Sequence, residues 1–542
     1  MAFARALWER RLDVWTDDPA TQQKIANRLG WLSALDVVEP LADRLRAIAH
    51  SIRDDGFSDI VLLGMGGSSL APEVLRNVVG VAPGFPRFRM LDSVDPDAVR
   101  DALAQAESSI FVLASKSGTT IEPNVMAAEA RRRLQSVCGD GWGRRFIAIT
   151  DDGTALHRRA VADRFREVFV NPADIGGRYS ALSLFGMVPA ALMGIDIQAL
   201  IAGAREMESA CRQETAAANP GLALGALMAA GAGSGRDKLT LLLPPALGSF
   251  GLWVEQLVAE STGKQGHGVV PITGETSAAP IGPDRVIVTL SVAGDGPAPE
   301  AIARAVGSGA PVARLDMAGA SHLGAEFLRW EVATAAAGVL MGINPFDEPN
   351  VQQAKDATRR LLDVFTREGR LPAAEAHAAV EGVRLTLSDA AQQELAGAAP
   401  QALLRVLRPG DYVGVLAYLP PFDDALGAVL REFRDRVSIE SGHATMFGYG
   451  PRYLHSTGQL HKGGANNGVF VVMTAEPAED LAIPGEAFSF AVLEMAQALG
   501  DFQSLDRAGR RALHVHFPRR DPALLQRVTA ALVGPLEGGP KA

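Results

Sequence analysis

DIVLLGMGGSSLAPEVL, residues 59–75, is a short apolar run that leads through Gly64, Gly66 and Gly67 into a helical pattern. Four similar runs rich in β-branched or aromatic residues follow it: FRMLDS (88–93), SIFVLAS (109–115), RFIAIT (145–150) and REVFV (166–170). Helical segments, for example 123–134, alternate with these runs. Alternation of this kind predicts an α/β fold, in which a parallel sheet carries helices on both faces.

The same alternation recurs twice farther along the chain. A second series contains KLTLLLPP (238–245), GVVPI (268–272), RVIVTLSV (285–292) and PVARLDM (311–317). A third series contains YVGVLAYL (412–419), HATMFGYG (443–450), NGVFVVMT (467–474) and ALHVHF (512–517). We therefore predict four regions: a helical segment over 1–56, α/β domains over 57–195 and 196–366, and a connector with a C-terminal α/β module over 367–542.

Two boundary segments of the second and third series are expected to be helical. A helix is predicted over 349–365, with Pro349 in its first turn, where the missing N–H costs nothing. The Ala- and Glu-rich stretch 367–410 is expected to form a helical connector.

Composition excludes several classes of function. The chain has 542 residues, which is too many for a single hydrophobic core. Its net charge is −10, and the sequence contains no basic stripe suited to nucleic acid. Its two cysteines, Cys138 and Cys211, form no CxxC motif, and no metal-ligand spacing is present. No signal-type segment and no run of roughly 18 apolar residues occurs. These features predict a cytoplasmic protein without a membrane partner.

A second strand–helix turn, ASKSGTTIEP (114–123), is unusually rich in hydrogen-bond donors. Four hydroxyls and one ammonium occur within six residues: Ser115, Lys116, Ser117, Thr119 and Thr120. An ordinary helix cap needs only one hydroxyl, whereas a phosphate monoester offers several acceptor oxygens to a helix N-terminus. This turn therefore favours a phosphate site, while the glycine-rich turn after residue 63 fits either a ligand site or a simple tight turn.

Two further residues are candidates for chemistry. Arg178 follows two glycines at a turn in DIGGRYSALS (174–183), where it either forms a surface salt bridge or faces a cleft. Glu260 ends a predicted helix in WVEQLVAESTGKQG (253–266), where the negative end of the helix dipole disfavours a carboxylate. Such a carboxylate has a raised pKa and suits a general base, although a solvated helix-end glutamate is the ordinary alternative.

Five motifs in this order resemble the phosphoglucose isomerase family: GMGGSSLAP, SKSGTTIEP, GGRYS, ESTGK and NPFDEPNVQQAK. They cover about residues 60–366. The N-terminal segment and the later motif PRYLHSTGQLHKGG resemble the isomerase half of bifunctional transaldolase–phosphoglucose isomerase proteins. The resemblance implies two sugar-isomerase (SIS) three-layer α/β/α domains with parallel sheets, together with N-terminal helices and a C-terminal α/β extension.

The resemblance also implies roles for the matching residues. The sugar-phosphate positions match Ser115, Ser117 and Thr120, with Lys116 beside them, and the positions that line the sugar match Gly67 and Ser68. The catalytic positions match Arg178 for the enediolate, Glu260 for the base that moves a proton between C2 and C1, and Lys355 and His455 for ring opening.

This sequence departs from the family pattern at two places. The histidine of the ordinary family lies between the base and the lysine, whereas His455 comes one hundred residues after Lys355. His267, soon after Glu260, is the alternative ring-opening histidine. Glu348 stands where the family has a glutamine. Because a carboxylate cannot donate a hydrogen bond unless it is protonated, we expect Glu348 to pair with Lys355 and to alter substrate preference.

The resemblance implies an isomerase that interconverts glucose 6-phosphate and fructose 6-phosphate through a cis-enediolate, in glycolysis and gluconeogenesis. This reaction moves a proton and an electron pair within the substrate, so neither a cofactor nor a metal is required. The implied partner is a small phosphosugar, and the implied assembly is a homodimer. Two alternatives stay open at this point, namely an isomerase that also accepts mannose 6-phosphate and a regulatory SIS protein that only binds phosphosugars.

Overall fold

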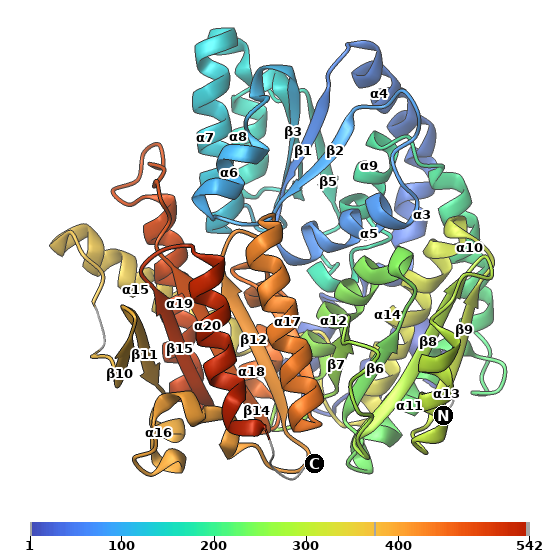
Figure 1. The fold of residues 1–542 in the computed structure, drawn as a ribbon. Coiled ribbons are helices and arrows are strands. Elements are labelled where there is room, and N and C mark those ends of the chain that lie inside the picture. Colours follow the sequence, from blue (N-terminus) through green and yellow to red (C-terminus); the bar gives the residue numbers. More distant parts are fainter. Residues whose placement is uncertain (1–2, 373–374, 538–542) are drawn as a thin grey trace.

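The computed structural model describes residues 3–372 and 375–537. Within them the chain forms three β-sheets, each flanked by helices. In Figure 1 the first sheet lies at the top, the second at the lower right and the third at the lower left. The α/β fold with parallel sheets is thus confirmed.

The first sheet is entirely parallel, in the order β2-β1-β3-β4-β5. Its strands are β1 (Asp59–Leu63), β2 (Arg87–Leu91), β3 (Ser109–Ala114), β4 (Phe146–Asp151) and β5 (Glu167–Asn171). Its helices are α5 (Leu70–Val78), α6 (Pro96–Ala102), α7 (Ile121–Cys138), α8 (Ala155–Ala162) and α9 (Leu184–Leu192). Every residue of β1 and β3 is buried, because helices cover both faces, and this explains their continuous apolar sequence.

The N-terminal segment consists of four short helices that pack onto the two following domains. They are α1 (Phe3–Trp8), α2 (Pro19–Ala26), α3 (Ala34–Val38) and α4 (Ala42–Asp54). Trp15, Leu35 and Ile52 belong to a core shared with the first and second sheets. The amphipathic spacing in the sequence therefore reflects packing.

The second sheet is also parallel, in the order β7-β6-β8-β9. Its strands are β6 (Lys238–Leu242), β7 (Val270–Thr273), β8 (Arg285–Val292) and β9 (Val312–Met317). Its helices are α10 (Ile197–Cys211), α11 (Pro220–Gly233), α12 (Gly248–Thr262), α13 (Pro299–Gly307) and α14 (Leu323–Leu340). Glu260 lies in the last turn of α12, as the sequence predicts.

The third sheet is mixed, in the order β10-β11-β15-β14-β12-β13. Its strands are β10 (Ala378–Val380), β11 (Val383–Leu387), β12 (Tyr412–Tyr418), β13 (Ala444–Tyr449), β14 (Gly468–Ala475) and β15 (Arg511–Phe517). Its helices are α15 (Val351–Glu368), α16 (Asp389–Leu395), α17 (Asp424–Ser441), α18 (Gly458–Gly463), α19 (Phe490–Arg507) and α20 (Pro522–Val533).

One expectation for the region that leads into this sheet is wrong, and one is confirmed. The stretch 367–410 is not a helical connector, because β10 and β11 form an antiparallel hairpin that adds to β15. VRLTL (383–387) alternates and contains β-branched residues, which favours a strand over the helical tendency of the surrounding alanines. The helix expected over 349–365 is confirmed as α15, which begins at Val351, with Asn350 as its N-cap.

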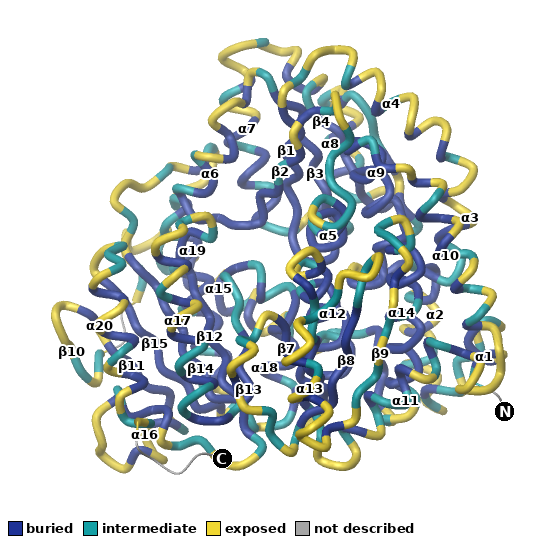
Figure 2. The backbone as a smooth tube through the Cα atoms, turned by 45° about the vertical axis from the view of Figure 1, so that its right-hand side comes forward, coloured by how far each residue is buried: buried dark blue, intermediate teal, exposed yellow. Residues whose placement is uncertain are grey.

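The third sheet brings its helices against the other two domains. At the end of α12, a Cβ on Gly263 would lie 2.4 Å from the Cα of Leu460 in α18, so the two backbones are in direct contact. Farther along, α15 packs on α19. Figure 2 shows that the buried residues run continuously through the three sheets, while exposure is confined to outer faces such as that of α4. No helix among the described residues is long and apolar enough to cross a membrane.

Candidate active site

The donor-rich turn lies between the end of β3 and the start of α7. Gly118 has a φ of +68°, and its N–H donates to the buried Ser115 Oγ at 3.2 Å. The Ser115 Oγ is also 3.4 Å from Thr120 Oγ1, and the exposed Ser117 and Thr119 hydroxyls lie 2.9 Å apart. The turn therefore gathers its four hydroxyls at the N-terminus of α7, a helix of 18 residues.

Lys116 in the same turn points elsewhere. Its Nζ is 2.5 Å from Asp151 Oδ2 at the end of β4 and 2.6 Å from the carbonyl oxygen of Ala173. This ion pair fixes the turn to the neighbouring strand. The residue lies beside the hydroxyl cluster, but its ammonium is committed to protein partners.

A cavity of about 250 Å³ opens over this turn, between α7, α15 and the short helix η11 (Arg452–His455). Its polar lining comes from four regions of the chain: Ser117, Thr119, Thr120, Glu122, Gln352, Lys355, Thr358, Arg359, His455 and Gln497. Lys355 and His455 therefore share one cavity with the hydroxyl cluster. His267, the alternative histidine, is exposed in the turn after α12 and does not line it.

His455 is held by a buried carboxylate that the sequence analysis did not single out. Its Nε2 lies 2.8 Å from Glu122 Oε1 in the first turn of α7. Gln497 of α19 donates a second hydrogen bond, of 2.6 Å, to the same oxygen. Burial opposes ionisation of Glu122, but the charge and hydrogen bond of His455 lower the pKa of this carboxyl. The pair therefore favours an ionised Glu122 beside a histidine that can carry a proton.

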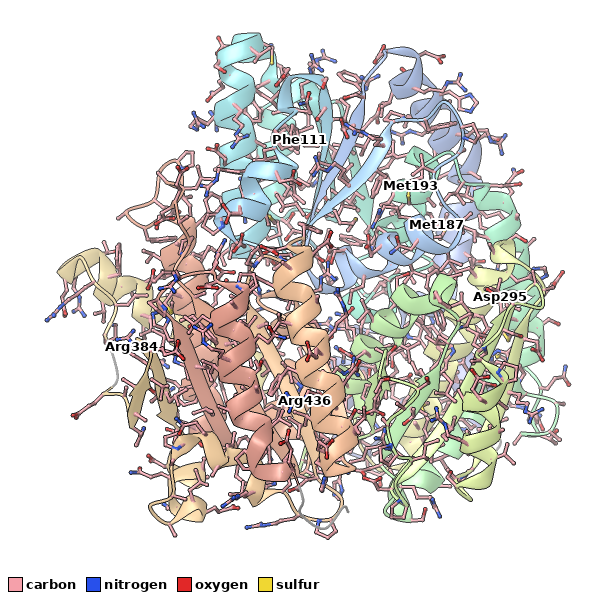
Figure 3. All side chains as sticks on the ribbon, in the orientation of Figure 1. Phe111, Met187, Met193, Asp295, Arg384 and Arg436 are labelled. Atoms are coloured by element: carbon pink, nitrogen blue, oxygen red, sulfur yellow. The ribbon has the colours of Figure 1, made fainter. Side chains whose placement is uncertain are left out.

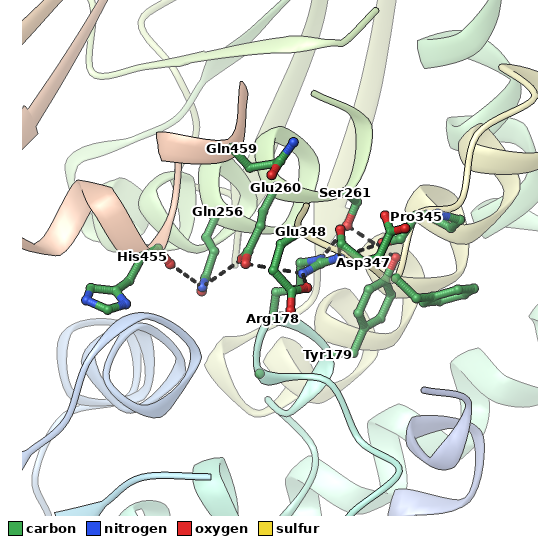
Figure 4. Close-up of polar contacts among 12 residues, drawn as sticks. Arg178, Tyr179, Gln256, Glu260, Ser261, Pro345, Asp347, Glu348, His455 and Gln459 are labelled. Carbon is green, nitrogen blue, oxygen red and sulfur yellow. Dashed lines mark hydrogen bonds and ion pairs between the residues drawn. The ribbon is translucent and has the colours of Figure 1, made fainter. Parts of the chain in front are cut away.

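A second cluster centres on Arg178, which is 4% exposed. Its Nη1 lies 3.2 Å from Glu260 Oε1 and 3.0 Å from Glu348 Oε2, so one nitrogen bridges two carboxylates (Figure 4). Its Nε donates to Ser261 Oγ at 2.8 Å, and its Nη2 donates to the carbonyl oxygens of Pro345 and Asp347. Contacts on all three nitrogens hold the guanidinium in one orientation.

The two carboxylates at Arg178 influence each other. Burial raises the pKa of Glu260 above its ordinary value; Arg178 opposes this shift, and the like charge of Glu348 adds to it. For Arg178, burial lowers the pKa while Glu260 and Glu348 raise it, and the net direction is upward. Glu348 therefore pairs with Arg178, and the expected pairing with Lys355 is wrong. Glu348 lies in the loop before α15, at the guanidinium, whereas Lys355 lies on the exposed side of the helix.

Gln256, one turn before Glu260 on α12, connects the two clusters. Its Nε2 donates to Glu260 Oε2 at 3.2 Å and to the carbonyl oxygen of His455 at 2.7 Å. Figure 4 shows that the carbonyl of His455 faces Gln256 while its imidazole points away from Glu260. The side-chain amide of Gln256 therefore lies between the carboxylate of Glu260 and the backbone carbonyl of His455.

The glycine-rich turn after β1 positions Arg178 through backbone contact. It forms the short helix η4 (Gly66–Ser68), which packs on η7 (Gly177–Tyr179). A Cβ on Gly67 would lie 1.9 Å from the carbonyl oxygen of Gly177, and no side chain fits there. Ser68 is half-buried and lies at the end of η4, two residues before α5 begins.

Lys264, the last residue of the ESTGK motif, anchors the loop that carries Glu348. Its buried Nζ donates to the carbonyl oxygens of Asn344 and Asp347 and to Asp347 Oδ1, at 2.5–2.8 Å. Burial and the charge of Arg178 lower the pKa of Lys264 to about 8. The spacing of Lys264 from Glu260 was visible in the sequence, but its partner loop, about 80 residues away, was not.

Together these groups supply a phosphate-sized hydroxyl cluster, a histidine–carboxylate pair and a buried carboxylate on a fixed arginine. Such a set can anchor an anion, exchange protons at one end of a ligand and stabilise a developing negative charge at the other. Among the described residues, no group of three or more histidine, cysteine or acidic side chains is arranged to hold a metal ion.

Comparison with known proteins places residues 36–281 in the family model described as phosphoglucose isomerase. The matched range contains the hydroxyl cluster, Arg178 and Glu260; it ends before Glu348, Lys355 and His455.

Two relatives extend the match. The glucose-6-phosphate isomerase of Rubrobacter xylanophilus is 31% identical over 377 residues, which are 60% of this chain and 85% of the relative. That of a Synechococcus species is 28% identical over 421 residues, which are 69% of this chain and 77% of the relative. The crystal structure of a glucose-6-phosphate isomerase from Chlamydia trachomatis covers 67% of this chain and 78% of its own, at 21% identity and a TM-score of 0.51, and so shares the fold.

Proposed function

Since this chain belongs to the phosphoglucose isomerase family, we propose that it interconverts glucose 6-phosphate and fructose 6-phosphate. The observation that carries the proposal is the bridge through Gln256, which joins the Glu260–Arg178 pair to the loop of His455. This bridge holds Glu260, which would carry the proton between the carbon atoms, close to His455, which would supply a proton to the ring oxygen.

Ring opening needs an acid at the ring oxygen and a base at the anomeric hydroxyl. The imidazole of His455, with Glu122 behind it, can hold or release a proton in the cavity that Lys355 also lines. Glu122 orients the ring. We assign the acid role to His455, with Lys355 as the second polar group at the ring.

Isomerisation then needs one base that removes the C2 proton and returns it at C1. Glu260 suits this role because burial and Glu348 raise the pKa of its carboxyl towards neutrality. The intermediate is an anionic enediolate, and Arg178 is a fixed cation beside the base. Because its three nitrogens are already held, little reorganisation is needed when the charge develops.

Substrate binding begins at the phosphate. Ser115, Ser117 and Thr120, with Lys116 beside them, surround the N-terminus of α7, where free N–H groups and the helix dipole favour an anion. An anchor at this end fixes the reacting carbons relative to the bases. The sugar itself would extend from here towards Gly67 and Ser68.

The rival in another class is a regulatory SIS protein that only binds phosphosugars. Such a protein needs the hydroxyl cluster but has no use for a buried base on a fixed arginine. The pairing of the buried Arg178 with the largely enclosed Glu260, whose side chain is 12% exposed, supports the enzyme. We also propose that the chain is closest to the isomerase half of the bifunctional proteins, works in the cytoplasm and forms a homodimer.

The test is a coupled assay on fructose 6-phosphate together with solvent-deuterium exchange at C2. The unaltered protein should turn over the substrate and incorporate deuterium, with equal rates in the presence and absence of EDTA. Glu260→Gln keeps the shape and removes the basicity, so turnover and exchange should fall by about 10²–10⁴. Glu300→Gln, on the exposed face of α13, is the matched control and should change neither. Exchange at a normal rate in the Glu260 variant would assign the base to another residue.

A further inference from the structure

A second cavity, of about 310 Å³, lies in the C-terminal module outside the proposed active site. It opens between the sheet and helix α19, at the carboxyl ends of β12, β14 and β15. None of the residues assigned above to substrate or catalysis lines it. The apolar part of the wall comes from Phe365, Val492, Met495 and Leu499.

A row of polar side chains crosses the floor of this cavity. Arg384, His516, Thr474 and Tyr418 are register partners on the adjacent strands β11, β15, β14 and β12. In the next register row on the same face, Thr386 and His514 are polar, while Val472 and Leu416 are apolar. Because burying polar groups costs free energy, a packed core favours apolar side chains, and a row of polar ones beside a cavity therefore favours a site.

The histidines of the ALHVHF motif belong to this floor. His514 and His516 are both buried, and the Thr474 hydroxyl lies 2.9 Å from a ring nitrogen of each. His516 Nε2 is 3.4 Å from Glu476 Oε1 at the mouth. The result is a chain of groups that can both donate and accept hydrogen bonds, which matches the hydroxyls of a ligand.

The cavity also lies where the strand order reverses. From β12 the chain crosses through α17 to β13 on one side, and from β14 it crosses through α19 to β15 on the other. Tyr418 and Thr474, near the carboxyl ends of β12 and β14, flank the reversal. Open parallel sheets bind their ligands in the crevice at this topological position.

Besides the polar row, two ionisable groups in the lining have capacity left for a ligand. Glu494, 5% exposed on α19, has a carboxylate oxygen with no hydrogen-bond partner among the described residues. Arg384 lies at the mouth, at the outer left edge of the module in Figure 3; it forms no ion pair within 4 Å in the described part of the chain, and its charge acts on Glu476. The acids at the mouth are engaged, because Glu476 faces His516 and Asp480 accepts two backbone N–H groups.

We infer that this cavity binds a small polyhydroxylated anion, whose hydroxyls contact Tyr418, Thr474 and His516 and whose anionic group pairs with Arg384. The inference adds a regulatory site to the proposed isomerase. Its regulatory part rests on the proposed function; the binding itself does not.

Two contacts connect the cavity to the ring-opening pair. On α19, Glu494 lies one turn before Gln497, which donates to Glu122 at 2.6 Å. On the other side, the Tyr418 hydroxyl is 3.2 Å from that of Tyr453, two residues before His455. A ligand that moves Glu494 or Tyr418 therefore acts on both members of the pair.

The binding test is calorimetric titration of the full chain with D-gluconate and, separately, with glycerol 3-phosphate. The two arms distinguish a carboxylate-ended from a phosphate-ended ligand, and gluconate has no phosphate for the turn at Ser115. We expect saturable binding of one molecule per chain in at least one arm. Arg384→Met should weaken it by about tenfold or more, because a charge-assisted hydrogen bond is lost. Thr474→Val, which keeps the shape, should weaken it in the same direction.

Two controls keep the binding result specific. Arg436→Met removes a comparable arginine from α17, where it pairs with Glu537 and lies away from the cavity, and should leave the affinity unchanged (Figure 3). Ser115→Ala with Thr120→Ala should also leave it unchanged. Absence of saturable binding in both arms, or binding that is lost in the Ser115/Thr120 variant and kept in Arg384→Met, would overturn the site.

Coupling has a readout that does not depend on isomerase activity. The NMR signal of the His455 ring carbon should shift when the probe that binds is present and stay unshifted in Arg384→Met. Binding without this shift would overturn the regulatory part and leave the site. A protein that binds the probe but lacks isomerase activity would refute the proposed function alone.

Discussion

His455 Nε2 and Glu122 Oε1 lie 2.8 Å apart although 333 residues separate them in the sequence. The contact exists because the C-terminal module folds back on the first domain and places η11 against the start of α7. It gives the cavity a histidine from a part of the chain that the family model does not match.

His455→Ala should slow turnover of cyclic glucose 6-phosphate by about 10²–10⁴, because ring opening loses its acid. Proton exchange on an open-chain substrate analogue, which needs no ring opening, should change much less. Glu122→Gln should give a weaker defect of the same kind, since the imidazole stays but loses its charged partner. His267→Ala is the matched control; if it alone shows the ring-opening defect, the earlier histidine is the catalytic one.

Glu348→Gln should shift the acidic limb of the kcat/KM profile to lower pH. The negative charge of Glu348 raises the pKa of Glu260, and Glu260 must be deprotonated to act as a base. Removal of that charge therefore lowers the pKa of Glu260 and extends activity towards acid. A pH profile measured from 5 to 9 tests this, and an acidic limb that stays in place or moves upward would show that Glu348 does not influence the base.

Ser115→Ala with Thr120→Ala should raise KM for glucose 6-phosphate by about tenfold or more, since two hydrogen bonds to a charged group are lost. The kcat at saturation should fall less. Free glucose should be a negligible substrate for both proteins. Steady-state kinetics on the two sugars tests this assignment of the phosphate site. Equal turnover of glucose and glucose 6-phosphate by the unaltered protein would contradict it.

Gly67→Ala should abolish most activity, because the added Cβ would lie 1.9 Å from the carbonyl of Gly177 and must displace the turn that carries Arg178. Gly177→Ala is a close control, since a Cβ at that position meets no atom within 4 Å. Activity assays together with far-UV circular dichroism separate displacement of Arg178 from unfolding. Full activity in Gly67→Ala would mean that the two turns are not rigidly packed.

Glu255→Gln should stabilise the protein increasingly as pH rises. Burial raises the pKa of Glu255 from 4.5 to about 8, so between these values the folded state binds a proton that the unfolded state has released. The free energy of unfolding of the unaltered protein therefore falls as pH rises through this window. The advantage of the variant should grow by about 2–5 kcal/mol between pH 5 and 9, as measured by denaturant unfolding. Glu300→Gln should show no such trend.

Much of the fold can be predicted from short, continuous stretches of the sequence. The apolar strands of all three sheets and the turn at Ser115 are visible because buried parallel strands and helix N-termini leave local patterns. The hairpin of β10 and β11 was missed because its strands are short and lie in an alanine-rich stretch with helical propensity. The partners of Arg178 are equally invisible, since the Glu348 that it contacts is 170 residues away.

The same limit explains the residues that the sequence did not single out. Glu122 looks like an ordinary acid in the first turn of a helix, which the dipole favours in any protein. Its role becomes clear only when His455 and Gln497 converge on it. Gln256 likewise lies in the middle of α12, and only its contact with the His455 carbonyl reveals it as a bridge.

The fold-back of His455 onto Glu122 of its own chain also has a genetic consequence. A chain that lacks Glu260 and a chain that lacks His455 each carry one incomplete centre, and a mixed dimer of the two gathers no complete one. Two such alleles expressed together in one cell should therefore fail to complement each other, whether or not the protein dimerises.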